Sequence, residues 1–159
     1  MANKTLDKMN WPLMLITLGV SWEWFKGGWG KLSEGEFVDG LAKTLGFFAS
    51  KNPNLWVKDF LVTVAIPNSL VFGNLVVIGE LTAGFCLFIG TALLAANKGI
   101  YTKLAYYLLV LGFGVGLALS LTFWAAAGWT SPSTEGLNFI LAVVEAAGLA
   151  WVVKELADR

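Results

Sequence analysis

Two glutamates lie inside long apolar stretches of this sequence. Glu80 and Glu145 are each flanked on both sides by runs of apolar and small residues. A charged side chain in the hydrocarbon of a bilayer costs about 2.5 kcal/mol or more, and it persists mainly where it is paired, enclosed or functional. A buried carboxyl can move a proton at a reacting centre, so both residues are candidate catalytic groups. Both also fit a structural role, as interhelical hydrogen bonds that hold a bundle in register.

A group of aromatic and polar residues could form the walls and donors of a binding site. Trp22, Trp24 and Lys26 follow one another closely at the end of the first apolar stretch, and Lys31 follows them. Asn138 lies seven residues before Glu145, which places the two on one face of a helix. Tryptophan rings can enclose a flat ligand, and lysine or asparagine can donate to a carbonyl or an anion. Trp22 and Lys26 are therefore candidates for meeting a quinone head or an external anion, and Trp24, Lys31 and Asn138 join them as binding candidates through a family resemblance.

Simpler explanations exist for part of this group. Tryptophans commonly form a belt at the membrane interface. Glu23 and Lys26 are three residues apart, a spacing at which an ion pair can form along one helix. Both explanations stay open at this stage.

The residue types that are missing exclude several chemistries. The chain has no histidine, which excludes His-ligated haem, the usual zinc and copper sites and His-based acid–base catalysis. Cys86 is the only cysteine, so the chain cannot form a Cys-x-x-Cys redox pair. We therefore expect no haem or metal bound by this chain. The formal net charge of zero gives no basis for binding nucleic acid.

The composition predicts a membrane protein. Hydrophobic residues make up 57% of the chain and charged residues 14%, whereas a soluble domain carries about 25% charged residues. Apolar runs approach the ~20 residues that cross a bilayer. We predict an all-α, integral membrane four-helix bundle, multi-pass in the cell membrane, that forms a single domain over residues 1–159. The expected spans are residues 11–29, 69–96, 102–127 and 135–153.

The segment between the first two spans predicts short surface helices. Apolar residues recur every three or four positions over residues 37–48, which is typical of an amphipathic helix at the membrane surface, and residues 55–66 predict a second short helix. Gly27, Gly28 and Gly30 suggest that the first helix ends near Trp29. Ser33 would then begin the next helix, in a capping box with Glu36.

The positions of basic residues predict the orientation. Lys98 and Lys103 flank the short connection between the second and third spans, whereas the connection between the third and fourth spans has no basic residue. Because cytoplasmic loops are enriched in lysine and arginine, we expect both termini to be cytoplasmic. The long segment 31–66 would then face outside.

Three short polar and glycine-rich motifs interrupt the apolar stretches: Gly27-Gly28-Trp29-Gly30-Lys31-Leu32, Gly79-Glu80-Leu81-Thr82-Ala83-Gly84 and Gly136-Leu137-Asn138. Their order resembles the DoxX-like superfamily, and within it the DoxD subunit of thiosulfate:quinone oxidoreductase. The resemblance extends over nearly the whole chain. It departs from the family pattern at residues 11–14, where many members have an arginine and this chain has none.

The resemblance implies a membrane subunit of a sulfur-compound (thiosulfate):quinone oxidoreductase. Thiosulfate would be oxidised to tetrathionate at the outer face with a second subunit, and electrons would pass to a membrane quinone as the substrate. Lys31, Glu80 and Asn138 occupy the family's polar motif positions, and Glu80 and Glu145 would serve the proton chemistry.

Two other functions remain open. The chain could be a non-catalytic accessory subunit of a larger respiratory or photosynthetic membrane complex, with Glu80 and Glu145 as structural residues. It could also be a small transporter or channel subunit with these carboxyls on a proton path, although no inverted repeat is visible in the sequence.

Overall fold

The computed structural model describes residues 11–96 and 99–158, and these ranges form helices without any strand. Lys98 and the first ten residues, which bear on the expected orientation, lie outside the described residues. The elements in chain order are α1 (Trp11–Glu34), α2 (Phe37–Lys51), α3 (Leu55–Phe60), the π-helical turn η1 (Leu61–Ala65), α4 (Ser69–Ala95), η2 (Gly99–Tyr101), α5 (Thr102–Ala127), η3 (Gly128–Thr130) and α6 (Pro132–Ala157).

Three helical segments of the described chain are long and apolar enough to cross a membrane. They are Ser69–Ala95, Gly99–Thr130 and Pro132–Ala157, which contain α4, α5 and α6. The sequence placed the start of the last helix at Glu135, but α6 begins at Pro132. The Ser131 hydroxyl accepts a hydrogen bond from the Thr134 backbone N–H at 3.1 Å, and the proline ring suits the first turn. The local cap therefore starts the helix one turn earlier.

Helix α1 continues through its glycines to Glu34, five residues beyond the end expected from the sequence. Gly35 follows with a φ of 73°, a left-handed conformation that commonly ends a helix. Ser33 lies inside α1 and donates to the carbonyl of Gly30 at 3.2 Å. The expected capping box with Glu36 is therefore wrong, and Lys31 belongs to α1.

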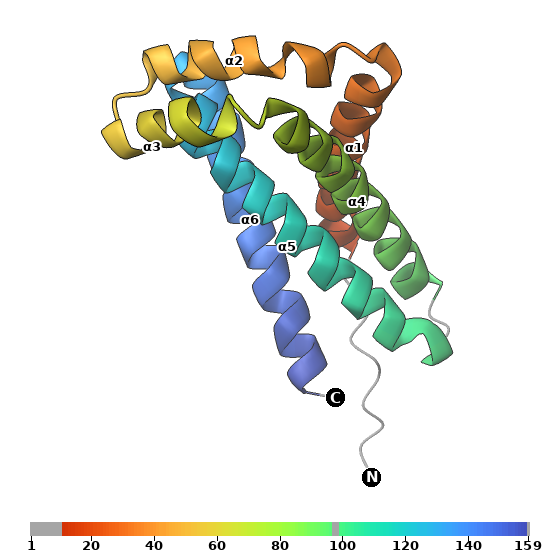
Figure 1. The fold of residues 1–159 in the computed structure, drawn as a ribbon. Coiled ribbons are helices and arrows are strands. Elements are labelled where there is room, and N and C mark those ends of the chain that lie inside the picture. Colours follow the sequence, from red (N-terminus) through yellow and green to blue (C-terminus); the bar gives the residue numbers. More distant parts are fainter. Residues whose placement is uncertain (1–10, 97–98, 159) are drawn as a thin grey trace.

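The long helices pack in sequence order, α1 on α4, α4 on α5 and α5 on α6, while α2 and α3 lie across one end of them (Figure 1). This end is where α1 finishes and α4 begins, and the C-terminal end of α6 lies at the opposite end (Figure 1). We call α2, α3 and η1 together the roof.

Small residues allow the long helices to approach closely. A Cβ at Gly84 of α4 would lie 2.7 Å from the backbone nitrogen of Phe25 in α1. A Cβ at Gly112 of α5 would lie 2.8 Å from Leu87 of α4. Both distances are too short for any side chain, so these positions require glycine for the observed packing.

Two apolar clusters stabilise the structure. The first lies among the long helices and contains Val20, Trp24, Ala83, Leu87, Tyr106, Leu109, Phe113 and Val152. The second joins the parts of the roof and contains Leu41, Leu45, Ala49, Val57, Leu61 and Ala65. Asn52, at the turn between α2 and α3, donates from Nδ2 to the carbonyl of Ala125 at 2.7 Å. This bond ties the roof to the end of α5.

Candidate functional site

One side of α1 carries polar groups into the bundle. Ser21, Trp24 and Gly28 are buried at helical spacing, and Lys31 continues the same side toward the roof. The hydroxyl of Ser21 donates to the carbonyl of Gly84 at 2.8 Å. Since a Cβ at Gly28 would lie 2.9 Å from Leu81 Cγ, α1 and α4 meet with almost no side chain between them. We call this side of α1 the inner face.

Glu145 on α6 is completely enclosed and receives two hydrogen bonds. Trp24 Nε1–H of α1 donates to Oε1 at 2.5 Å, and the hydroxyl of Ser120 on α5 donates to Oε2 at 2.7 Å. The side chain is 0% exposed. Gly116 leaves room for it, because a Cβ there would overlap the carboxyl group. Glu145 thus connects three helices, and each of its oxygens has a donor.

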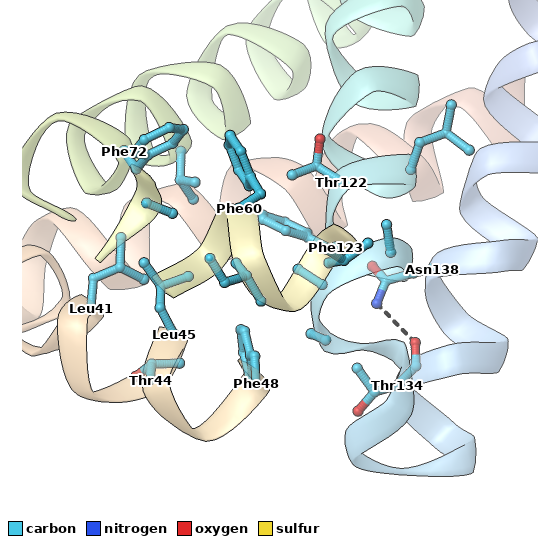
Figure 2. Close-up of a pocket in the computed structure, with 18 of the residues that line it drawn as sticks. Leu41, Thr44, Leu45, Phe48, Phe60, Phe72, Thr122, Phe123, Thr134 and Asn138 are labelled. Atoms are coloured by element: carbon cyan, nitrogen blue, oxygen red, sulfur yellow. Dashed lines mark hydrogen bonds between the residues drawn. The ribbon is translucent and has the colours of Figure 1, made fainter. Parts of the chain in front are cut away.

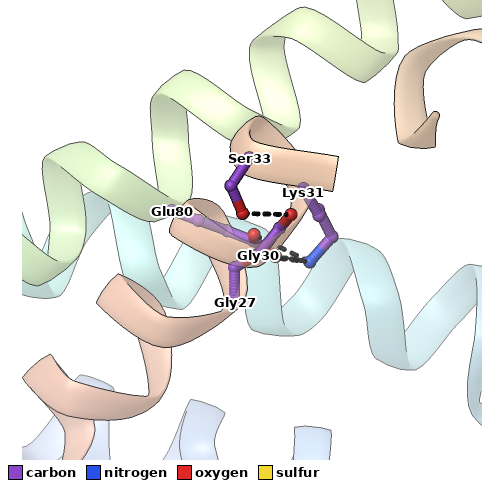
Figure 3. Close-up of polar contacts among 5 residues, drawn as sticks. All are labelled: Gly27, Gly30, Lys31, Ser33 and Glu80. Carbon is purple, nitrogen blue, oxygen red and sulfur yellow. Dashed lines mark hydrogen bonds and ion pairs between the residues drawn. The ribbon is translucent and has the colours of Figure 1, made fainter. Parts of the chain in front are cut away.

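Glu80 on α4 forms an ion pair with Lys31 of α1 (Figure 3). Lys31 Nζ lies 2.8 Å from each of the two carboxylate oxygens. The Glu80 side chain is 3% exposed and that of Lys31 is 26% exposed, so the pair is buried on its acidic side and partly open on its basic side. Gly27 provides the space, since a Cβ there would lie 3.4 Å from Oε2. Lys31 Nζ also lies 5.2 Å from the centre of the Phe37 ring, a cation–π distance.

A cavity of about 550 Å³ lies between the roof and helices α4, α5 and α6 (Figure 2). Its walls are mainly apolar and include Leu41, Leu45, Phe48, Phe60, Phe72, Val76 and Phe123. Lys31 and Asn138 both reach it, from α1 and α6 respectively. Asn138 Nδ2 donates one hydrogen to the carbonyl of Thr134 at 2.8 Å (Figure 2), which leaves the second amide hydrogen for a ligand.

The candidate residues suggested by the sequence lie in three different places in the structure. Lys31 and Asn138 line the cavity, and Glu80 lies directly behind Lys31. Trp24 is buried and pairs with Glu145, and neither of these lines the cavity.

Trp22 and Lys26 lie on the opposite, exposed side of α1. Trp22 is 60% exposed and borders a different, smaller groove of about 390 Å³ between α1 and α4. The expected ion pair between Glu23 and Lys26 is absent: within residues 11–96 and 99–158 the ion pair is Lys31–Glu80. Both Glu23 and Lys26 point outward at the surface of the single chain.

Two residues of the site were not identified from the sequence. Ser120 donates to Glu145, and it lies one turn after Gly116 on the small-residue face of α5. Phe123 lines the cavity, and its ring centre lies 6.2 Å from that of Trp24, so it contacts both the cavity and the Trp24–Glu145 pair. The spacing of Gly112, Gly116 and Ser120 is a sequence signal that could have indicated the serine.

Neither glutamate belongs to a metal-binding group. The described residues contain no cluster of three or more His, Cys, Asp or Glu side chains that could hold a metal ion. Comparisons with protein-family models, curated proteins and solved structures found no match. The case for a function therefore depends on the cavity and on the residues around it.

Proposed function

We propose that this chain is a four-helix membrane subunit of a sulfur-compound:quinone oxidoreductase, and that the cavity under the roof binds the quinone ring. The observation that carries the proposal is that Lys31 and Asn138, from two different helices, reach one apolar cavity. Ligand sites of this kind combine apolar walls with a few polar groups that orient the ligand.

The chemistry of the cavity suits a quinone. A quinone ring is flat and apolar, with two carbonyl oxygens on opposite sides that accept hydrogen bonds. The third N–H of Lys31 makes a long contact of 3.5 Å to the Gly27 carbonyl and can turn to donate to one oxygen, and the free amide hydrogen of Asn138 can donate to the other. Phe48, Phe60 and Phe123 provide aromatic walls of the same cavity (Figure 2).

The reaction needs a second subunit. Two thiosulfate ions each lose one electron and join as tetrathionate, and the quinone takes these two electrons with two protons to become a quinol. In this proposal thiosulfate reacts on an outer-face subunit, and this chain holds the quinone. Lys31 stabilises negative charge that develops on the ring oxygen during reduction.

The two glutamates act through other residues in this proposal. Glu80 positions Lys31 by holding its ammonium group with both carboxylate oxygens. Glu145 positions Trp24, which packs against the cavity residue Phe123. Neither carboxyl lines the cavity, so protons reach the quinone by way of Lys31 or water.

The proposed topology has four membrane crossings, with α1 as the first. Its 24 residues extend about 36 Å at ~1.5 Å per residue, enough for a hydrocarbon core of about 30 Å. With both termini in the cytoplasm, the roof lies at the outer surface. Leu55 and Trp56 of α3 are 80% and 73% exposed, which is typical of residues that rest in the membrane interface.

A second candidate function is that of a non-catalytic accessory subunit in a larger respiratory or photosynthetic membrane complex. The observation that favours it is that all four carboxylate oxygens of Glu80 and Glu145 already have donors within the chain. Such satisfied carboxyls connect helices without any reaction. In that case the cavity would hold a lipid chain.

Quinone binding by the purified full chain in nanodiscs tests the proposal. The ligand is decylubiquinone, and its affinity is measured by titration calorimetry. Asn138→Leu removes a donor from the cavity and should weaken binding about tenfold. Asn74→Leu is the matched control, because Asn74 Nδ2 makes the same local bond, to Leu70 O at 2.7 Å, and lies outside the cavity lining. Wild-type chain that binds no quinone, or equal losses in the two variants, would contradict the proposal.

Activity of the complex separates the two candidates. Chain isolated from its native membrane with its partners should reduce decylubiquinone when thiosulfate is added, and Asn138→Leu should lower that rate. If the isolated complex contains haem or metal subunits and the rate is unchanged by Asn138→Leu, the accessory function is the correct one.

A further inference from the structure

Helix α1 has a second polar face, on the side opposite its inner face. Glu23 and Lys26 are exposed there, one turn apart. Trp22 and Trp29 share this side and are 60% and 54% exposed. We call this side of α1 the outer face. The acid and the base on it form no ion pair with any described residue.

The two charges lie near the middle of α1, which would be the most apolar depth of a membrane that α1 crosses. Glu23 is twelve residues after Trp11, about 18 Å along a helix of about 36 Å at ~1.5 Å per residue. Charged side chains at such a depth are normally paired or enclosed by protein. If α1 crosses the membrane, which is part of the proposed function, its outer face therefore needs a cover that supplies opposite charges.

We propose that a second copy of this chain covers the outer face of α1, in a two-fold symmetric dimer. In a symmetric interface each residue meets a partner reciprocally. One acid and one base, three residues apart on one face, are complementary to themselves under such symmetry. Glu23 of each copy pairs with Lys26 of the other, which neutralises four charges with two ion pairs.

The surroundings of the two charges suit this contact. Gly19 and Gly30 lie on the same side of α1, before and after the charged pair, and a Cβ at either position would meet nothing within 4 Å. Small residues at these places let two helices approach closely. Beside them, Phe25 and Phe85 pack edge to face at 5.2 Å between ring centres and border the groove of about 390 Å³. Aromatic residues around a charged pair exclude lipid and water from it.

Disulfide crosslinking in native membranes tests the contact. Cys86→Ser removes the single natural cysteine, and Gly19→Cys or Gly30→Cys then places one thiol on the outer face. Oxidation with copper phenanthroline should give a band of twice the monomer mass. Gly114→Cys on α5 is the matched control, because its surroundings are equally open and it should give no such band. Absence of the band in both outer-face variants, or an equal band in the control, would overturn the proposal.

Charge exchange at Glu23 and Lys26 tests whether ion pairs between two copies of the chain stabilise the dimer. Glu23→Lys or Lys26→Glu alone brings like charges together and should weaken dimerisation about tenfold, measured by single-molecule subunit counting in liposomes. The double exchange Glu23→Lys/Lys26→Glu restores opposite charges and should return the dimer. Single exchanges without effect, or a double exchange that fails to restore the dimer, would count against a second copy. So would crosslinking of Gly19→Cys to a different protein.

Measuring decylubiquinone binding by the same variants distinguishes a failure of the dimer proposal from a failure of the proposed quinone site. The outer face and the cavity share no lining residue, so the charge exchanges should leave the affinity for quinone unchanged. A chain that binds quinone but stays monomeric would refute the dimer alone. A chain that dimerises but binds no quinone would refute the proposed ligand alone.

Discussion

Replacement of Lys31 by methionine should destabilise the bundle more than replacement of its partner Glu80 by glutamine. In Lys31→Met a carboxylate that is 3% exposed loses both of its hydrogen bonds and its counter-charge. Removal of one member of a buried ion pair costs about 3–5 kcal/mol. In Glu80→Gln an amide oxygen still accepts from Lys31, and the 26% exposed ammonium can reach the cavity. That change should cost about 1–2 kcal/mol, close to the loss of a charge-assisted hydrogen bond.

The double variant Lys31→Met/Glu80→Met sharpens this prediction. Apolar residues of similar size often replace a buried ion pair at little or no cost. The double variant should therefore be more stable than Lys31→Met by about 2 kcal/mol or more. The free energy of unfolding is measured for the full chain in bicelles by titration with SDS, with tryptophan fluorescence as the signal.

Lys43→Met on α2 is the control for the loss of a lysine. Lys43 is exposed and its ammonium makes no ion pair with the described residues, so the change should stay within about 0.5 kcal/mol of wild type. The reasoning is refuted if Lys31→Met behaves like this control. It is equally refuted if Lys31→Met/Glu80→Met is no more stable than Lys31→Met.

Three further predictions concern packing, the cavity and the roof. Gly84→Ala should destabilise the bundle by about 1–3 kcal/mol because its Cβ meets backbone of α1, whereas Gly114→Ala, in open space on α5, should not; SDS unfolding compares them. Val76→Phe fills part of the cavity and should abolish decylubiquinone binding in calorimetry, while Val71→Phe on the exposed side of α4 should preserve it. Asn52→Ala removes the bonds to Ala125 and Ala126, so hydrogen exchange should become faster in the roof and stay unchanged in α6.

The long apolar helices were predictable because hydropathy is a sum over neighbouring residues. The helix expected at residues 102–127 is α5, Thr102–Ala127, and the one expected at residues 69–96 is α4, Ser69–Ala95. The start of α6 differs from the expected one because it depends on a single capping bond from the Thr134 N–H to the Ser131 hydroxyl, which hydropathy does not reflect. Errors of this kind remain local, at the ends of helices.

The end of α1 was misjudged for a different reason. Three glycines within four positions favour a break in an isolated helix. In the protein the same glycines are needed where α1 meets α4, since Gly28 lies against Leu81 and Gly27 makes space for Glu80. Packing outweighs local propensity here, and it carries Lys31 to its acidic partner.

The sequence by itself determined that the chain is helical, that its long helices suit a membrane, and that Glu80 and Glu145 need an enclosed partner, because these properties follow from residue type and near neighbours. Only the tertiary structure decided which partners they have. Lys31 and Glu80 are 49 positions apart in the chain, and Trp24 and Glu145 are 121 apart. The tertiary structure also decided that Lys31 and Asn138 share one cavity while Trp22 and Lys26 face away from it. Contacts at such separations depend on how whole helices pack, which no local pattern in the sequence specifies.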